Sequence, residues 1–386
     1  MRGAIALGFQ GSRRLPVSRP SVRLSTIERP NVVGGNRNVP KKSLGIIFTI
    51  RQNPTRPRPL YDIYNDYLDD AEIAENDLGF EYLWVSEHHL SSDRWCPAPF
   101  AMLGAVASRT KKIRLGTAVL VPALHNPLEV SENFAMLDNL SGGRMDIGVG
   151  PGASPEEFIA FNVPQSESWR RTWELLDFVG KTFTEERVTF DGEFFKYDDV
   201  WQSTKPIQNP VPVWWGGFGP KSLRRAAERG YHIMGAGAPL YDEALIELGK
   251  SVDDHQVSQI TAIHLAETHD QAWDEAQDGI HWFVNFHRLR HKHYSFGCTP
   301  EGPLETWPPA QELRNIKGLG FMPGFPMYVG TPEFVREQLI ADLGGRNGRI
   351  TQLLFDFRAG GGAETPAVRR SMELFRTEVM PYLPLD

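Results

Sequence analysis

From Ser43 to the end of the chain, short strand-like blocks alternate with helix-like blocks, and this alternation limits the possible folds more than any other feature. The strand-like blocks are rich in apolar, β-branched and aromatic residues, whereas the helix-like blocks repeat apolar residues at helical spacing. We predict strands at 44–50, 82–87, 113–121, 145–149, 211–216, 231–234, 259–265 and 352–357. We predict helices at 61–78, 98–108, 128–140, 170–184, 222–229, 242–255, 270–287, 332–342 and 366–382. Such a chain pairs its strands in parallel through right-handed crossovers, which gives an α/β fold.

An alternating chain can close into a barrel or form an open doubly wound sheet. The eight predicted strands, the length of 386 residues and the lack of a glycine fingerprint after the first strand favour the barrel. We therefore predict a (β/α)8 TIM barrel with insertions. Residues 186–210 are expected to form a hairpin or meander laid over the barrel, and a loop-rich stretch of about forty residues precedes the 332–342 helix.

The composition is that of an ordinary globular enzyme, with 41% hydrophobic and 23% charged residues. No apolar run is long enough to span a bilayer, which argues against an integral membrane protein. The two cysteines, Cys96 and Cys298, are too few for a disulfide scaffold and fit a reducing compartment. We therefore expect a cytoplasmic protein that does not bind membranes.

The net charge of −7 divides unevenly along the chain. Residues 1–42 hold seven Arg and two Lys against one Glu, so this segment carries +8 and the remainder −15. The segment has no sustained helical pattern, and we expect a basic, disordered extension before a single barrel domain at 43–386. A targeting or nucleic-acid-binding tail is the alternative. The acidic body argues against nucleic-acid binding by the folded part.

Barrel enzymes carry their reactive groups where strands end, so the strand ends are the places to search. The second predicted strand ends in Ser86-Glu87-His88-His89. An imidazole there can exchange a proton near neutral pH, which makes His88 a candidate catalytic residue. The alternative is a surface cluster or a buried histidine with satisfied hydrogen bonds.

Two glycine-rich turns follow the fourth and fifth predicted strands. The first contains Gly150, where a planar ligand could approach the backbone closely, although a plain tight turn is the better explanation of this block taken alone. The second runs through Gly216, Gly217 and Gly219 to Ser222 at the start of a helix. Free N–H groups, the helix dipole and the serine hydroxyl would bind a phosphate, while ordinary capping by Ser222 is the alternative.

Read together and in order, these blocks resemble the bacterial-luciferase-like family of flavin-dependent monooxygenases, from Ser43 to nearly the end of the chain. The most specific blocks are Glu87-His88-His89, Gly116-Thr117-Ala118 with Pro127, 137–144 (LDNLSGGR), 226–230 (AAERG) and 371–375 (SMELF) with 379–383 (VMPYL). Each block alone could arise by chance. Five in the family's order indicate membership.

The resemblance implies a site built around FMN. His88 matches the family's catalytic histidine beside the flavin ring, and Ala118–Val119 matches a non-proline cis peptide beneath it. Ser222 and the N–H groups after Gly219 match the phosphate-binding turn, and residues 294–328 match a mobile active-site loop. Reduced FMN from a separate flavin reductase would react with oxygen to a flavin hydroperoxide that oxidises a small organic substrate. The family also implies a dimer.

The chain departs from luciferase at two positions of this site. Gly150 and Pro151 stand where luciferase has a cysteine and a phosphate-contacting arginine, and Phe218 stands where it has an acid. Lys221 could supply the missing charge, or neutral groups could hold the phosphate. Both departures weaken the case for long-chain aldehyde oxidation with light emission, and neither weakens the case for flavin binding.

Three alternatives stay open at this point. The first is a deazaflavin-dependent oxidoreductase on the same fold, and the second is a non-catalytic flavin-binding or subunit-partner relative. The third is a metal-dependent barrel hydrolase, suggested by His88-His89 and His291-Lys292-His293, although we expect no metal. Four tryptophans near strand ends would line an apolar pocket or belong to the core: Trp84, Trp95, Trp214 and Trp215.

Overall fold

The computed structural model describes residues 42–385 except 236, 290–297, 300–301, 304–308, 317–318, 321–324 and 347. Within these residues a nine-stranded sheet forms, and eight of its strands close into a barrel. The barrel strands, in ring order, are β1 (Ser43–Phe48), β2 (Tyr82–Val85), β3 (Arg114–Thr117), β4 (Met145–Val149), β7 (Val213–Trp215), β8 (His232–Met234), β9 (Val257–Leu265) and β13 (Gln352–Asp356). The pairings β8–β9 and β13–β1 close the ring. The predicted TIM barrel is confirmed.

All neighbouring barrel strands run parallel, so their carboxyl ends meet at one rim. Along β2, for example, Trp84 lies opposite Gly116 on one neighbour and Ile47 on the other. Loops that follow strands far apart in the sequence are thereby brought to a common mouth.

Large side chains fill the inside of the barrel. Trp84 and Trp214 lie edge to face with ring centroids 5.3 Å apart, and both are fully buried. The glycines on neighbouring strands make room for them: a Cβ on Gly116 would lie 2.2 Å from the Trp84 ring, and one on Gly148 would lie 3.2 Å from it. The part of the barrel that contains these rings is therefore a packed core, and the open space lies beyond them, toward the carboxyl ends of the strands.

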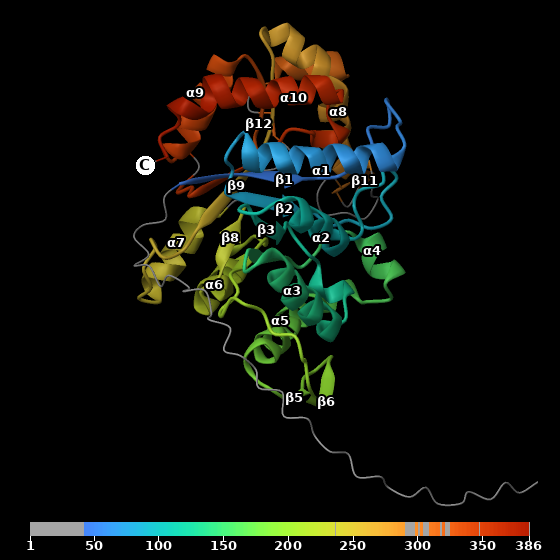
Figure 1. Cartoon of the computed structure of the whole chain (residues 1–386), viewed down its shortest axis with the longest axis vertical. Coiled ribbons are helices and arrows are strands. Elements are labelled where there is room, and N and C mark those ends of the chain that lie inside the picture. The colour runs from blue at the N-terminus through green and yellow to red at the C-terminus, as the bar shows by residue number, and fades with distance from the viewer. Residues whose placement is uncertain are drawn as a thin grey trace, which may run out of the picture. The chain divides into compact units, whose positions relative to one another are not determined.

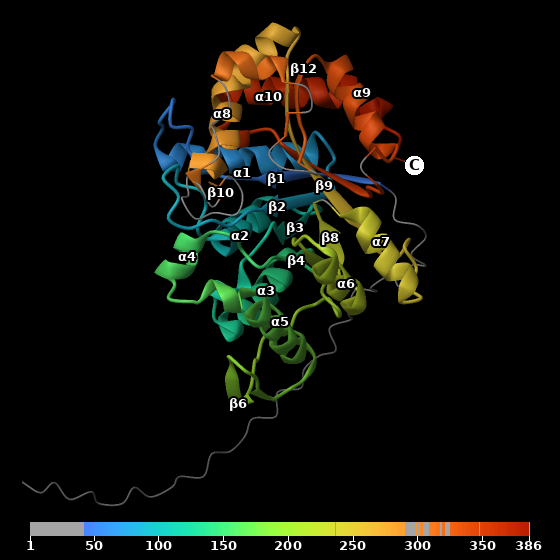
Figure 2. The same ribbon diagram turned by 180° about the vertical axis from the view of Figure 1, so that it is seen from behind.

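Helices surround the strands, as Figures 1 and 2 show from opposite sides. They are α1 (Leu60–Asn76), α2 (Pro99–Arg109), α3 (Pro127–Ser141), α4 (Pro155–Ala160), α5 (Ser168–Thr184), α6 (Pro220–Arg229), α7 (Ala238–Glu247), α8 (His269–Leu289), α9 (Pro332–Leu343) and α10 (Thr365–Leu374). Local sequence sets their ends. In α3 the Asn126 side chain accepts hydrogen bonds from two N–H groups at the start, and Gly142 ends the helix at a φ of 73°.

Two insertions differ from the prediction. The hairpin of β5 (Val188–Asp191) and β6 (Lys196–Val200) is confirmed, but it lies against α5 and not over the barrel (Figure 1). Its aromatic rings explain this, because Phe190 and Tyr197 both pack on Phe178 of α5. The prediction also missed β12 (Met327–Gly330), which pairs with the last part of β9 after β13 has ended.

Two predicted helices have different ends. The helix expected at 242–255 is α7, which starts and stops earlier, at Ala238–Glu247. The helix expected at 366–382 begins as α10 and continues as a π-helical turn, Phe375–Val379, and a 3-10 turn, Met380–Tyr382.

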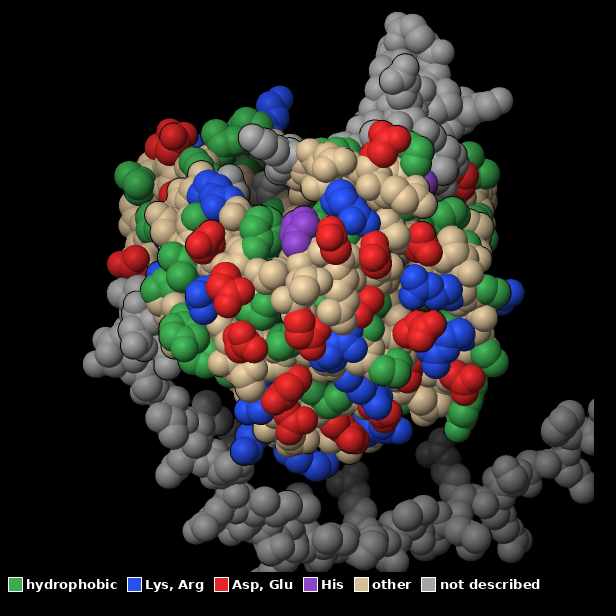
Figure 3. All heavy atoms as spheres, turned by 90° about the horizontal axis from the view of Figure 1, so that it is seen from above, with side chains coloured by type: hydrophobic (Ala, Val, Ile, Leu, Met, Phe, Trp, Pro, Cys, Tyr) green, Lys and Arg blue, Asp and Glu red, His purple; other side chains and the backbone are tan. Residues whose placement is uncertain are grey.

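No helix in the described part of the chain has the length and apolarity needed to cross a bilayer. On the face shown in Figure 3, acidic and basic side chains are interspersed. The basic segment 1–42, apart from Lys42, lies outside the described residues, as do His291–His293 and much of the 294–328 loop.

Candidate active site at the carboxyl ends of the barrel strands

A cavity of about 510 Å³ opens where the barrel strands end. Its walls come from the ends of β1, β8 and β13, from β9, from the segments after β2, β3, β4 and β7, and from α8 and residues 325–327, and most of the lining is apolar. Apolar lining residues include Ile47, Trp95, Val119, Phe283, Phe325 and Met327. A cavity of this size can enclose most of a small organic molecule or a flavin ring. Its few polar groups are therefore the ones to examine for chemistry.

His88 lines this cavity and is held by a buried carboxylate. Its Nδ1 lies 2.8 Å from Oε1 of Glu157, whose side chain is 1% exposed. The backbone N–H of His89 donates to the same oxygen at 2.9 Å. A carboxylate at Nδ1 favours the ring tautomer with a proton there, which leaves Nε2 as the nitrogen that accepts or returns a proton.

The His88 ring also contacts Trp95, which in turn packs against Arg51. The ring packs on Trp95 at a centroid distance of 4.3 Å, and the guanidinium of Arg51 lies 3.4 Å from the centre of the Trp95 ring. The Trp95 indole N–H donates to Ser86 Oγ at 2.7 Å. Arg51 is itself buried, with Nη1 3.4 Å from Asp93. These contacts restrict the position of His88 in the cavity wall.

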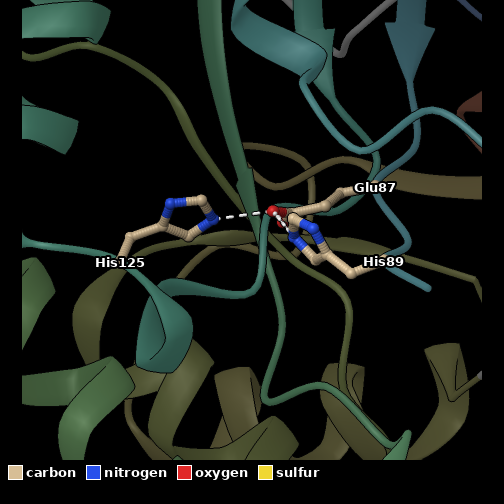
Figure 4. Close-up of side chains that lie close together, drawn as sticks. All are labelled: Glu87, His89 and His125. Atoms are coloured by element: carbon tan, nitrogen blue, oxygen red, sulfur yellow. Dashed lines mark hydrogen bonds and ion pairs between the residues drawn. The ribbon is translucent and has the colours of Figure 1, made fainter. Parts of the chain in front are cut away.

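Glu87 turns away from His88 and meets two other imidazoles. Its Oε1 lies 2.9 Å from Nε2 of His89 and 2.6 Å from Nε2 of His125, as Figure 4 shows. Its Oε2 accepts the N–H of Val121 at 2.7 Å. Burial raises the pKa of Glu87, but the hydrogen bonds from His125 and His89 outweigh burial and bring it to about 2. Adjacent His88 and His89 therefore serve different clusters and do not form one metal-binding pair.

Asp356, at the end of β13, is the second carboxyl group of the cavity. Thr49 Oγ1 donates to it at 2.6 Å and the N–H of Arg358 at 3.0 Å. Burial dominates here and raises the pKa of Asp356 to about 6, in spite of these hydrogen bonds. The cavity thus holds a carboxyl group that can change protonation near neutral pH.

The Ala118–Val119 peptide is cis, at the position where the family resemblance implied one. Both residues line the cavity just beyond the end of β3. The third predicted strand is therefore shorter than expected, since it stops at Thr117, before this peptide.

The glycines of the two turns let protein segments pack closely, and their expected role in cofactor binding stays a prediction. Gly216 and Gly217 line the cavity, but Gly150 does not. A Cβ on Gly150 would lie 2.8 Å from the Gly216 carbonyl, one on Gly216 would lie 2.5 Å from Val119, and one on Gly217 would lie 2.6 Å from Trp215. The missing side chains therefore make room for the protein's own atoms, which lets the segments after β3, β4 and β7 pack closely.

The predicted phosphate turn lies at the start of α6. Gly219 has a φ of 94° and precedes the helix, as expected for a glycine at this turn. Neither Gly219 nor Ser222 is among the residues that line the cavity. Ser222 N–H donates to the Gly219 carbonyl at 3.1 Å, and Ser222 Oγ accepts the indole N–H of Trp215 at 2.7 Å. The serine therefore anchors Trp215, and its hydroxyl proton is the group it could offer a phosphate.

Of the four tryptophans considered, Trp95 lines the cavity. Trp84 and Trp214 point into the packed barrel, and Trp215 points outward and stacks on Trp173 at 4.1 Å. For these three, the core interpretation holds. Trp169, from α5, contributes to the cavity wall without having been considered.

The sequence analysis missed the polar partners of the site: Glu157, His125 and Asp356. For Glu157 a signal exists in the sequence, because Ser154-Pro155-Glu156-Glu157 has the pattern of a helix start with a glutamate at its third position. That pattern would have revealed α4, which begins at Pro155. It would not have revealed that Glu157 binds His88.

Comparison with known proteins gives the family directly. The family model described as luciferase-like monooxygenase matches residues 44–346. The 4-hydroxyprotoasukamycin monooxygenase of Streptomyces nodosus subsp. asukaensis is 27% identical over 337 residues, which covers 81% of this chain and 85% of that protein. The limonene 1,2-monooxygenase of Rhodococcus erythropolis is 26% identical over 332 residues and covers 81% and 80%.

Solved structures agree in fold. Monooxygenase RslO1 from Streptomyces bottropensis superposes with a TM-score of 0.72 at 25% identity and covers 88% of this chain and 99% of its own. The oxygenating constituent of 3,6-diketocamphane monooxygenase from Pseudomonas putida, in complex with FMN, gives 0.70 at 20% identity, covering 90% and 100%. An F420-dependent secondary alcohol dehydrogenase gives 0.64 at 22% identity, covering 88% and 98%. With a family match across most of its barrel, this chain belongs to the luciferase-like monooxygenases.

Proposed function

We propose that this monooxygenase uses reduced FMN and molecular oxygen to oxidise a small, apolar organic molecule. The observation that carries the proposal is the pairing of His88 with the buried Glu157 carboxylate in the wall of an apolar cavity. The similarity to a limonene 1,2-monooxygenase and to a Baeyer–Villiger monooxygenase suggests alkenes and cyclic ketones as the first substrates to test.

The residues present fit a flavin. The cavity of about 510 Å³ has mostly apolar walls and opens beside Ala118–Val119, where the ring would lie. Ser222 and Lys221, at the start of α6, would hold the phosphate end. When bound, reduced flavin supplies the electrons that activate oxygen, which protein side chains cannot do.

The chain itself would control protons and water. His88, with Nδ1 engaged by Glu157, accepts or returns a proton at Nε2. The packing of Trp95 on Arg51 would keep the imidazole in place, and apolar lining residues such as Phe283 and Met327 would disfavour water in the cavity. Exclusion of water protects reactive intermediates from hydrolysis.

A deazaflavin-dependent oxidoreductase is the second candidate. It is favoured by the F420-dependent alcohol dehydrogenase structure and by a 33% identical relative over 190 residues, the F420-dependent glucose-6-phosphate dehydrogenase of Kineococcus radiotolerans. Such an enzyme transfers a hydride and needs no oxygen. The two candidates therefore differ in whether oxygen enters the product.

The deciding experiment uses isotopically labelled oxygen. Purified protein is loaded anaerobically with reduced FMN, mixed with a panel of alkenes and cyclic ketones, and exposed to the labelled gas. We expect one labelled oxygen atom in a product, found by mass spectrometry. Turnover without label, or rapid oxidation of NADPH by the protein alone, would contradict the proposal.

A separate flavin reductase, a dimeric assembly and a cytoplasmic location are further parts of the proposal. The buried, unpaired Cys96 is consistent with a reducing compartment. Adding a flavin reductase with NADPH should start turnover, and light scattering should give the mass of a dimer.

A further inference from the structure

The cluster of Glu87, His89 and His125 is separate from the chemistry assigned to His88. His89 and His125 are not among the residues that line the cavity, and Glu87 directs its carboxylate toward them (Figure 4). Glu87 and His89 follow β2, whereas His125 follows the short 3-10 turn Pro122–Leu124 after β3. Two loops are therefore joined through one carboxylate.

Three potential metal ligands converge in this cluster. The ligand atoms, Glu87 Oε1, His89 Nε2 and His125 Nε2, all lie within 4.8 Å of one another. Two of the separations are 2.6 and 2.9 Å. Ligand atoms around a tetrahedral zinc ion lie roughly 3.3 Å apart, so small side-chain rotations would open room for an ion.

The charge of the cluster also favours the binding of a cation. The Glu87 side chain is 0% exposed, and its ion-pair partners in the described part of the chain are the two histidines, with no Lys or Arg among them. Hydrogen bonds from the two imidazoles and from the N–H of Val121 engage this buried carboxylate. A bound cation would add the fixed positive charge that a Lys or Arg side chain would otherwise supply.

We propose that Glu87, His89 and His125 form a binding site for a divalent transition-metal ion, with zinc as the expected occupant. Two imidazoles and one carboxylate are a ligand set that zinc accepts, with solvent at the fourth position. The side chains of His89 and His125 are 13% and 20% exposed, so water and an incoming ion can reach the site. Each ring would bind through Nε2 and carry its proton on Nδ1.

The site has a supporting contact of the kind metal ligands need. The N–H of Val121 donates to Glu87 Oε2, which fixes the carboxylate and leaves Oε1 facing the imidazoles. Since Val121 and Glu87 also border the cavity, the ion would fasten the loops after β2 and β3 beside it. We assign the ion a positioning role: it would hold the two loops together, while its fourth position stays open to solvent.

The test measures metal, not activity. The full chain is incubated with zinc sulfate, desalted, and assayed by plasma mass spectrometry. We expect about one zinc ion per chain, as for a folded structural site, and a higher melting temperature than after treatment with a chelator. His125→Ala should lose the zinc and the chelator-dependent shift in melting temperature.

A partly buried imidazole–carboxylate pair away from the cavity supplies the matched control. His264 Nε2 lies 2.9 Å from Glu275, but with one imidazole where the Glu87 cluster has two. His264→Ala should keep the zinc content of the natural chain. Should His125→Ala not fold, the chelator experiment on the natural chain still decides.

The metal site is overturned if the natural chain retains no more zinc than His125→Ala. It is also overturned if His264→Ala loses as much zinc as His125→Ala does. A melting temperature indifferent to both chelator and zinc overturns it too. None of these outcomes involves flavin or oxygen, so they leave the proposed function untouched.

Discussion

Two parts of the cavity wall, the end of β2 and the turn before α6, hold their side chains in different ways. At the end of β2, His88 and Glu87 are fixed by groups 69 and 38 residues away, Glu157 and His125. At the turn before α6, Ser222 is fixed by Trp215, which is seven residues away.

The two parts also differ in charge. The end of β2 carries carboxylates and imidazoles at hydrogen-bonding distance, whereas the turn carries glycines, the Ser222 hydroxyl and the positive charge of Lys221. A group that moves protons needs partners that control its protonation, and a group that holds a phosphate end needs only donors. The comparison therefore favours the β2 end for the proposed proton transfer and leaves the turn as the proposed place for the phosphate end of the cofactor.

The largest effect should come from His88. His88→Ala should lower coupled oxygenation by about two to four orders of magnitude, the usual value of general acid–base catalysis, and leave flavin affinity nearly unchanged. Stopped-flow turnover and a flavin titration measure the two. Loss of turnover in His89→Ala but not in His88→Ala would show that His89, and not His88, takes part in the reaction.

Asp356 tests whether a cavity carboxyl group without an imidazole partner behaves differently. Its pKa is raised to about 6 in the folded chain, above the ordinary 3.8. Below about pH 4 the group is protonated in both states; as pH rises through about 6, the unfolded state is favoured by roughly 3 kcal/mol. Asp356→Asn should not show this loss. The difference between its unfolding free energy and that of the natural chain should therefore shift in favour of Asp356→Asn as pH rises from about 4 to about 7.

Urea unfolding at a series of pH values checks this prediction. If the curves of unfolding free energy against pH run parallel for the two proteins, the Asp356 carboxyl group is not held toward its neutral form.

Glu157 tests whether distant partners matter at the β2 end. Glu157→Gln keeps the shape but not the charge, and we expect kcat to fall roughly 10- to 100-fold with KM little changed. Glu157→Asp should recover part of the loss. A rise in KM with unchanged kcat would indicate a purely structural carboxylate. So would the same decrease in melting temperature and in activity for Glu157→Gln and Glu157→Asp.

The smallest effect is expected at the turn. Ser222→Ala should weaken FMN binding by about 1–2 kcal/mol, the value of a hydrogen bond to a charged group. Ser222→Thr retains a hydroxyl and serves as the control. Equal FMN affinity in all three proteins, with a lower melting temperature for Ser222→Ala, would mean that the serine only anchors Trp215.

The barrel could be predicted from sequence because its signals are local. Each strand is a short apolar block, and Asn126 and Gly142 mark the ends of α3. The strand β12 was missed because it completes the pairing of β9, which is a tertiary contact and leaves no periodic pattern in a four-residue strand.

A site residue could be predicted only where its type and its position at a strand end were enough to identify it. His88 was found at a strand end, but its partner Glu157 lies on another loop, and no spacing rule connects them. Whether a tryptophan enters the cavity or the core depends on a one-residue register, as Trp214 and Trp215 show by pointing to opposite sides. The glycines were found, but their use in packing protein against protein required the structure.

The most direct test of the account is an anaerobic titration of the purified chain with reduced FMN and, separately, with reduced coenzyme F420, followed by oxygen. We predict saturable binding of reduced FMN and weaker or no binding of F420. His88→Ala should still bind reduced FMN but should change the oxidation of the bound flavin by oxygen. Tight binding of F420 with no retention of reduced FMN would contradict the account.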